Sequence, residues 1–234
     1  RGPVPIGSGV VNSHDIVIIG GGSAGYAAAR TASQRGADVA IVDRGPLGGL
    51  CILRGCMPTK TILRTAEIAS LMRRAKEFGL SPVEVTADLG KIVDRKDRLV
   101  QECADYRIEQ LRDPRFTLYQ GDASFLSPDR LQVGSQELDA KAFVIATGST
   151  PNEVLIPGLS ETGYLTSDAL LDLRDRPASM VVLGGGPVAL EFGQFFARIG
   201  TAVTIIQRSG HLLSHLDADV GIALNDAFLE EGIG

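Results

Sequence analysis

Two cysteines and a lysine lie close together in the segment GGLCILRGCMPTK, residues 48–60. Cys51 and Cys56 are two of only three cysteines in the 234-residue chain, and Lys60 follows in the same segment. A closely spaced thiol pair can form a redox-active disulfide or bind a metal. The metal hypothesis is disfavoured, because the remaining cysteine and histidines have no zinc-binding spacing: Cys103, His14, His211 and His215. We therefore expect redox chemistry and no metal site.

The backbone between the two cysteines must depart from a regular helix if their sulfur atoms are to bond. Side chains five positions apart on a helix point about 140° away from one another, so a disulfide would not fit. Gly55 supplies backbone freedom and Pro58 is acceptable only in a first turn, which predicts a helix start near Cys56. A thiolate at a helix N-terminus is stabilised by the helix dipole and by N–H groups. Cys56 is therefore expected to be the better stabilised thiolate.

Two glycine-rich turns each follow a β-branched run and precede a helical pattern. DIVIIGGGSAGYAAARTASQRGADVAIVD, residues 15–43, predicts strand, turn, helix and strand, and MVVLGGGPVALEFGQFFARIGTAVTIIQ repeats this order from Met180. In such units one glycine permits the turn, one lets a pyrophosphate approach the helix end, and one packs helix on strand. A glycine-rich βαβ unit that binds nothing is the alternative. The predicted dinucleotide contacts are Gly20, Gly22, Ser23, Ala24 and Gly25, and in the second unit Gly184, Gly186, Val188 and Ala189.

In each of the two units, the residues at the end of the second strand help to predict which dinucleotide binds. Asp43 can accept hydrogen bonds from both hydroxyls of an unphosphorylated ribose, and Arg44 follows it. In the second unit Gln207 occupies this place and is followed by Arg208, and a nearby arginine suits a 2′-phosphate. We expect NADPH rather than NADH there, although Arg208 could equally be a solvated surface residue.

The two glycine units belong to separate domains of an α/β protein. Between them the patterns predict helices over about 57–77 and 87–112, and then an antiparallel meander formed by FTLYQ, RLQV and AFVIAT. Cys103 shares helical spacing with Leu89, Leu99 and Tyr106, which predicts a buried core thiol. The predicted organisation is a flexible leader or tag remnant over 1–13, a first dinucleotide-binding domain over 14–150, a connector over 151–178, and a second dinucleotide-binding domain over 179–234.

Composition restricts the partners. The apolar content is 44% and the net charge is −5, with no run of lysine or arginine. A nucleic-acid or anionic-membrane surface is therefore disfavoured, and a small-molecule partner fits better. Because no apolar run reaches the length of a membrane span and no signal-type segment is present, we expect a cytoplasmic protein.

Four segments, in the order IIGGGSAG, VDRGPLGGLCILRGCMPTK, IATGS and LGGGPVALE, resemble the class I pyridine nucleotide-disulfide oxidoreductases. The cysteine segment is the specific part of this resemblance, which covers residues 14–234. It implies a Rossmann-like FAD-binding domain and the start of a Rossmann-like NAD(P)-binding domain. The implied activity passes electrons from NADPH or NADH through FAD to a Cys51–Cys56 disulfide, and then to a disulfide or metal-ion substrate. Dihydrolipoyl dehydrogenase and mercuric reductase are the nearest types, and a glutathione reductase type is the alternative.

The resemblance also implies individual roles. Cys51 would exchange with substrate and Cys56 would face the flavin. Lys60 would lie near the flavin and pair with Glu191, although two solvated side chains are the alternative. The other implied FAD contacts are Gly20, Gly22, Gly25, Asp43, Gly49, Ala123, Thr147, Gly148 and Ser149.

Some features depart from the family pattern. Leu53 and Arg54 replace a frequent Asn-Val, and Pro187 stands where some relatives have an aromatic gate. Family members run about twice as far and end in a dimerisation domain that carries an acid–base histidine, which this chain lacks. We expect a fragment of a longer homodimeric enzyme, and a truncated, non-catalytic flavin-binding protein is the alternative.

Overall fold

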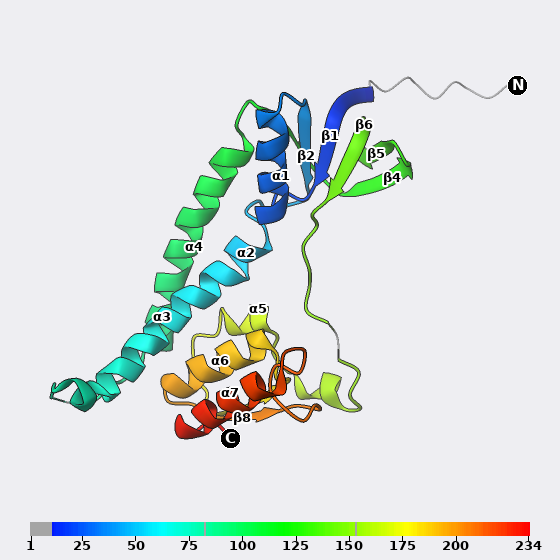
Figure 1. The fold of residues 1–234 in the computed structure, drawn as a ribbon. Helices are drawn as coiled ribbons and strands as arrows, with labels where there is room; N and C mark the ends of the chain where they lie inside the picture. Colours follow the sequence, from blue (N-terminus) through cyan, green and yellow to red (C-terminus); the bar gives the residue numbers. More distant parts are fainter. Residues whose placement is uncertain (1–10, 82, 153) are drawn as a thin grey trace, which may run out of the picture. The chain divides into compact units, whose positions relative to one another are not determined.

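The computed structural model describes residues 11–81, 83–152 and 154–234. These residues form two compact units (Figure 1). The first unit contains the described residues up to Gly55 together with Val100–Thr150, and the second contains Cys56–Leu99 and Pro151–Gly234. Residues 1–10 of the predicted leader lie outside the described residues, whereas residues 11–13 belong to a strand. The functional domains predicted over 14–150 and 179–234, with their connector, remain a prediction.

The first unit is built on a six-stranded sheet. Its strands are β1 (Val11–Ile19), β2 (Val39–Asp43), β3 (Phe116–Gln120), β4 (Ala123–Ser127), β5 (Arg130–Val133) and β6 (Gln136–Ile145), in the spatial order β3-β2-β1-β6-β5-β4. β1 pairs in parallel with β2 and β6, so that Ile19 lies opposite both Val42 and Ile145. Because the carboxyl ends of parallel strands meet at one edge, the turns that follow β1, β2 and β6 converge there.

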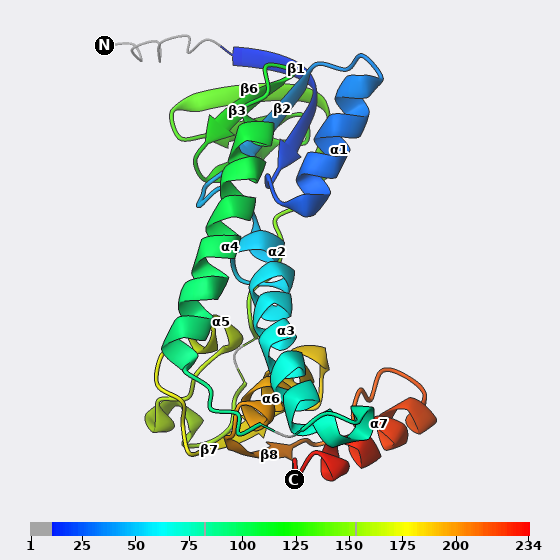
Figure 2. The same cartoon turned by 90° about the vertical axis from the view of Figure 1, so that its left-hand side faces the viewer.

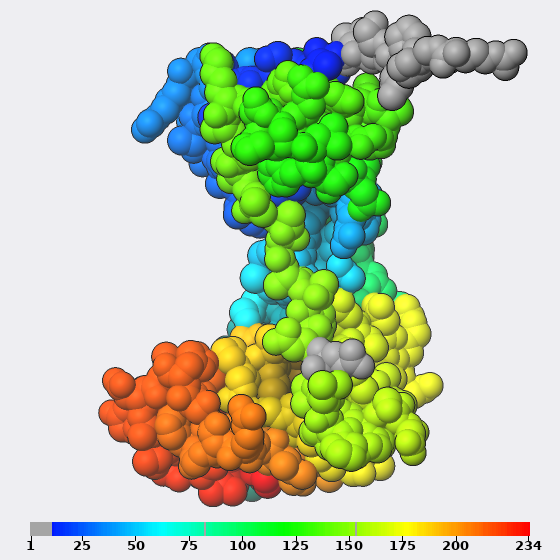
Figure 3. All heavy atoms as spheres, turned by 90° about the vertical axis from the view of Figure 1, so that its right-hand side faces the viewer, coloured from blue at the N-terminus to red at the C-terminus, as the bar shows by residue number. Residues whose placement is uncertain are grey.

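The antiparallel meander differs from the prediction in two of its three segments. It consists of β4, β5 and the start of β6, whereas FTLYQ forms β3 and pairs in parallel with β2. AFVIAT covers the later part of β6, which pairs in parallel with β1. Alternating side chains indicate a strand but not its partner. β3 follows a long helix, and a crossover of that kind brings strands together in parallel. Residues of β4 and β5 form part of the outer surface of this unit (Figure 3), where Phe125 and Leu126 are exposed.

The helix α1 (Ser23–Gln34) packs on β1 and β2 (Figure 1). Val39, Ala40, Ile41 and Val42 of β2 are all essentially inaccessible to solvent, as expected for an inner strand of a parallel sheet. Ile18, Ala29 and Leu111 complete the core on the side of α1. A short helix, α2 (Leu50–Leu53), follows the loop after β2.

The second unit holds the second βαβ motif and most of the helices. Its strands β7 (Ser179–Leu183) and β8 (Ala202–Ile206) pair in parallel on either side of α6 in the chain. Its apolar core includes Ile62, Ala66, Phe195 and Phe196, and Figure 2 shows α3 beside α6. The helical elements are α3 (Cys56–Arg73), η1 (Ala75–Phe78), the first half of α4 (Leu89–Leu111), η2 (Leu159–Thr162), α5 (Ser167–Leu170), α6 (Pro187–Arg198) and α7 (Ala218–Glu230).

The predicted apolar stripe on α4 is wrong. Cys103 is only half-buried and Tyr106 is 64% exposed. The buried face is set instead by residues such as Leu89, Val93 and Ala104, so Tyr106, two positions after Ala104, points about 200° away. No helix among the described residues is long and apolar enough to cross a membrane.

Candidate functional site

The turn after β1 leaves no room for side chains. Gly20 has a φ of +105°, and a Cβ there would lie 2.3 Å from the carbonyl oxygen of Ala146. A Cβ on Gly25 would lie 1.8 Å from the carbonyl oxygen of Gly20, so α1 packs directly against the turn that precedes it. Both positions require glycine, because an overlap with backbone atoms cannot be relieved by a side-chain movement. This is the tight strand-to-helix turn that the sequence predicted.

The start of the cysteine segment lies against this same turn. Gly49 has a φ of +77°, and a Cβ there would lie 2.4 Å from the Cα of Gly22. Leu50, which begins α2, reaches the turn after β6, because a Cβ on Gly148 would lie 3.9 Å from the Cβ of Leu50. The first unit therefore brings together three predicted segments that are distant in sequence: Gly20–Gly25, Gly49–Cys51 and Thr147–Ser149.

The start of α1 can receive an anion. Gly22 is the N-cap residue and contributes no side-chain hydrogen bond, while Ser23 and Ala24 are exposed. The first N–H groups of a helix have no partner within the helix, and the helix dipole makes this end positive. A Cβ on Gly22 would meet only Gly49, at an ordinary contact distance of 3.6 Å. The protein itself therefore leaves space beside the helix end that a phosphate can occupy.

Asp43 is held at the end of β2 by main-chain donors. Its Oδ2 accepts a hydrogen bond of 2.7 Å from the N–H of Gly21, and its Oδ1 accepts one of 2.7 Å from Gly45. Each carboxylate oxygen can accept a further bond, so the group remains able to receive ribose hydroxyls. Arg44 beside it is exposed, and its Nη1 lies 3.8 Å from the Oδ1 of Asp122. Ala123, the predicted adenine contact, begins β4 and is half-buried.

The chain breaks its helical course between the two cysteines, as the sequence predicted. α2 ends at Leu53, Arg54 leaves helical geometry with a φ of −142°, and α3 begins at Cys56 with Pro58 in its first turn. A Cβ on Gly55 would lie 3.1 Å from the Cα of Cys51. The backbone after α2 therefore folds back onto Cys51, and a side chain at Gly55 would press on this backbone. Cys51 is half-buried and Cys56 is exposed; their bonding remains a prediction.

Lys60 and Glu191 are in contact within the second unit. The Lys60 ammonium donates a hydrogen bond to the Glu191 Oε1 and forms an ion pair with it. Lys60 comes from the first turns of α3, and Glu191 from the first turns of α6. The two side chains are therefore paired in this structure, although Lys60 stays exposed, and their role beside the flavin remains a prediction.

The second glycine turn is more open than the first. Gly184 has a φ of +117°, and neither it nor Gly186 would bring a Cβ within 4 Å of another part of the protein. α6 starts with Pro187 at its first position, and Val188 is exposed while Ala189 is half-buried. Space for a ligand therefore lies beside the start of α6.

Gln207 and Arg208 lie immediately after β8 and differ in their surroundings. The Gln207 side chain donates to the carbonyl oxygen of Ser209 at 3.0 Å, and a Cβ on Gly185 would overlap its Oε1 at 1.9 Å. The Gln207 amide is thus folded over the glycine turn. Arg208 is exposed.

A family profile described as pyridine nucleotide-disulphide oxidoreductase matches residues 14–234. The chain belongs to this family. Curated relatives include mercuric reductase from Staphylococcus aureus, 39% identical over 94% of this chain and 40% of the relative. Dihydrolipoyl dehydrogenase from Bacillus subtilis is 34% identical over 93% of this chain and 49% of the relative. The chain therefore spans about half, or somewhat less, of the length of these two relatives.

A solved structure supports the same assignment. The HOCl-induced flavoprotein disulfide reductase RclA from Escherichia coli matches with a TM-score of 0.79 and 28% identity, over 94% of this chain and 48% of that one. Pyridine nucleotide-disulphide oxidoreductases of this kind use FAD and a nicotinamide cofactor. The predicted fold class, with a Rossmann-like first domain, a meander and the start of a second such domain, is confirmed.

The residues present fit FAD at the first unit of this pyridine nucleotide-disulphide oxidoreductase. The close approaches at Gly20, Gly25 and Gly49 shape a glycine-lined turn, and the helix end beside Gly22 stays open. Asp43 and Arg44 flank one side of it. The described residues contain no cluster of three or more His, Cys, Asp or Glu side chains that could hold a metal.

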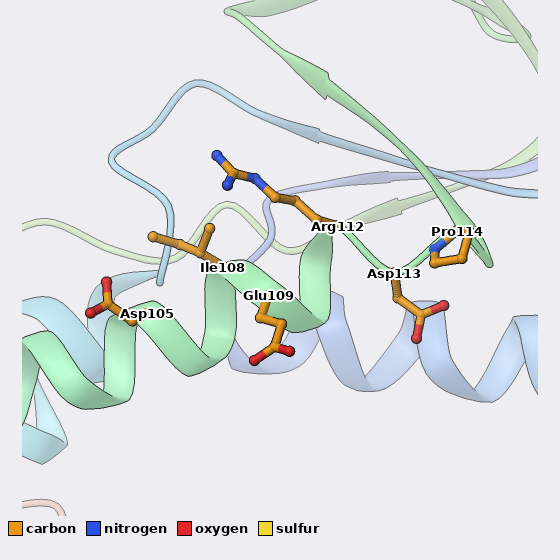
Figure 4. Close-up of a pocket in the computed structure, with 6 residues that line it drawn as sticks. All are labelled: Asp105, Ile108, Glu109, Arg112, Asp113 and Pro114. Atoms are coloured by element: carbon orange, nitrogen blue, oxygen red, sulfur yellow. The ribbon is translucent and has the colours of Figure 1, made fainter.

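One surface hollow of the first unit is lined by none of the predicted site residues. A depression of about 580 Å³ is lined only by residues from the end of α4 and the turn after it. Figure 4 shows that Glu109 and Asp113 point away from Arg112. The polar side chains that line the hollow therefore do not converge on one point where a ligand could bind.

Proposed function

We propose that the full-length protein is an FAD-dependent NAD(P)H:disulfide oxidoreductase. The observation that carries this proposal is the packing of Gly49 on Gly22, which joins the cysteine segment to the dinucleotide turn. FAD, when bound, supplies the transfer of two electrons from NAD(P)H to the protein's disulfide. Opening the Cys51–Cys56 disulfide takes up these two electrons and two protons and yields two thiols. The two thiols then reduce the substrate and close the disulfide again.

The remaining roles, cofactor binding and thiol exchange, belong to residues of this chain. The glycine turn and the start of α1 bind the FAD pyrophosphate, Asp43 binds its ribose, and Ala123 and Thr147–Ser149 complete the site. Cys51 exchanges with substrate. Cys56, at the N-terminus of α3, is the thiol beside the flavin, where the helix end stabilises its thiolate. The ion pair of Lys60 and Glu191 lies one turn further along α3.

The substrate is a disulfide or a thiol-binding metal ion. The relatives favour these two classes, because the similar proteins named above are mercuric reductase and dihydrolipoyl dehydrogenase. We further propose NADPH as the donor, since Gln207 is uncharged where a carboxylate would repel a 2′-phosphate, and the exposed Arg208 can attract one. A cytoplasmic homodimer with FAD-binding and NAD(P)-binding domains within 14–150 and 179–234 completes the proposal.

The test is the spectrum and turnover of the full-length protein. It should purify with bound flavin and gain long-wavelength charge-transfer absorbance when NADPH is added. Turnover is measured with lipoamide, oxidised glutathione and mercuric ion, and Cys56→Ser should abolish it while leaving FAD bound. A full-length protein without flavin, or normal turnover in Cys56→Ser, would favour the non-catalytic alternative. Efficient reduction of glutathione disulfide alone would favour the glutathione reductase type.

A further inference from the structure

Helix α3 carries two of the groups that the second unit contributes to the proposed chemistry. Cys56 and Lys60 lie four positions apart at its N-terminal end, and side chains with this spacing share one helix face. Lys60 forms the ion pair with Glu191 of α6. The direction of α3 relative to α6 therefore decides where Cys56 and Lys60 are presented.

A second polar contact joins the same two helices at their other ends. Arg73, the last residue of α3, donates from its Nη1 to the carbonyl oxygen of Arg198 at 2.5 Å. Arg198 is the last residue of α6, so this carbonyl has no N–H partner within its helix. A guanidinium is also favourable here, because a helix C-terminus carries partial negative charge. The contact satisfies a main-chain group of α6 and links it to the Arg73 side chain of α3.

The end of α6 that Arg73 binds is itself held in place. The Arg198 guanidinium forms two hydrogen bonds to Glu231, of 2.7 and 2.5 Å, and Gln194 donates to the same carboxylate at 2.9 Å. Glu231 follows the last residue of α7. Arg73 therefore ties α3 to a point that two other helices already define.

Apolar packing alone leaves the angle between α3 and α6 adjustable. Ala66 is fully buried in the core shared with Phe195 and Phe196. Beside this contact, however, a cleft of about 520 Å³ is lined by both helices, including Lys60, Leu63 and Arg198. The cleft leaves part of the interface unpacked, so apolar contact alone restrains the angle between the helices less than a fully packed interface would.

The position of Ala66 makes the two ends of α3 move together. Lys60 lies about 9 Å along the helix axis from Ala66, and Arg73 about 10 Å in the opposite direction, at 1.5 Å per residue. A rigid helix that pivots at Ala66 therefore moves Lys60 by almost the same distance as Arg73, in the opposite sense. A shift of about 1 Å at the active end is enough to impair a reaction substantially.

We propose that Arg73 is a positioning residue of the disulfide reductase. It holds α3 at the angle at which Lys60 contacts Glu191 and Cys56 is placed for the proposed thiol chemistry. This inference rests on the proposed function. Arg74 provides the comparison, because this neighbouring arginine lines the same cleft but directs its guanidinium hydrogen bonds to Glu77, at 2.7 to 3.1 Å.

The experiment uses the flavin-loaded, full-length enzyme with Arg73→Met, Arg73→Lys and Arg74→Met. Three quantities are measured: kcat, the KM for the nicotinamide cofactor, and the pH midpoint of the charge-transfer absorbance in the two-electron-reduced enzyme. Arg73→Met should lower kcat by about fivefold or more with KM changed by less than about twofold. It should also raise the pH midpoint, because the thiolate loses part of its stabilisation. Arg73→Lys keeps a cationic donor and should therefore retain most of the wild-type kcat and a pH midpoint close to that of the wild type. Arg74→Met should match the wild type in both quantities.

Two results would overturn the inference. One is a wild-type kcat and pH midpoint in Arg73→Met. The other is an equal loss in Arg74→Met, which would indicate general weakening of the helix. If Arg73→Met does not fold, Arg73→Gln replaces it and is judged by the same criteria. A wild-type enzyme with no charge-transfer absorbance would instead refute the proposed function, and the inference with it.

Discussion

Replacing Gly49 by alanine tests the packing that joins the cysteine segment to the first glycine turn. Its φ of +77° is unfavourable for alanine by about 1 kcal/mol. The new Cβ would also lie 2.4 Å from the Cα of Gly22, so the two backbones would have to separate by more than about 1 Å to reach ordinary contact. Overpacking of this kind adds about 2 kcal/mol. We expect Gly49→Ala to lower the free energy of unfolding by about 3 kcal/mol in total.

Gly36→Ala is the matched control. Gly36 has a φ of +84° in the same unit, but a Cβ there would meet nothing within 4 Å. It should therefore lose only the backbone contribution of about 1 kcal/mol. Urea unfolding of the flavin-free proteins gives both stabilities, and flavin fluorescence gives FAD affinity, which should weaken about tenfold or more only in Gly49→Ala. Equal stabilities in the two variants, with unchanged FAD binding in Gly49→Ala, would refute this reasoning.

Two further predictions concern the cofactor and pH. Gln207→Glu should lower the ratio of kcat/KM for NADPH over NADH by about tenfold, because a carboxylate beside the glycine turn repels a 2′-phosphate; an unchanged ratio would contradict the placement of the adenosine there. A hydrogen bond from Lys141 lowers the pKa of Asp15, aided by the N–H of Asp38. Because this pKa is lower in the folded state, the stabilisation is present above the ordinary aspartate pKa and is lost as pH falls through the lowered value. Urea unfolding should therefore show a smaller loss of stability below about pH 4 in Asp15→Asn than in the wild type, and identical profiles would contradict it.

The elements that sequence could predict depend on local chemistry. Gly20 marks a turn through its positive φ, and Gly25 permits the close packing of α1 on that turn, so a glycine pattern after a strand predicts both. Gly55 and Pro58 likewise fix the start of α3 to within a residue. The pairing of Lys60 with Glu191 was not accessible from such signals and came from the family resemblance, since the two residues belong to different helices.

Other features depend on tertiary packing and were not predicted. β3 alternates like a meander strand but pairs with β2, because pairing is decided by the crossover helix. A lysine on a helix is usually solvated, so no sequence signal indicated that Lys96 would be buried. Its ammonium donates to the Leu171 carbonyl at 2.9 Å and to Asp172 at 3.0 Å. The contact of Arg73 with α6 also has no sequence signal, since arginine is common near helix ends for reasons of charge alone.

The most direct test of the account is a count of thiols in the flavin-loaded, full-length enzyme before and after anaerobic addition of NADPH. Alkylation followed by peptide mass spectrometry identifies which cysteines react. We predict that Cys51 and Cys56 are linked and unreactive in the oxidised enzyme, and that both become alkylated after reduction by NADPH. If both react fully before reduction, or if the thiols that NADPH exposes map to other cysteines, the redox role of the segment is contradicted.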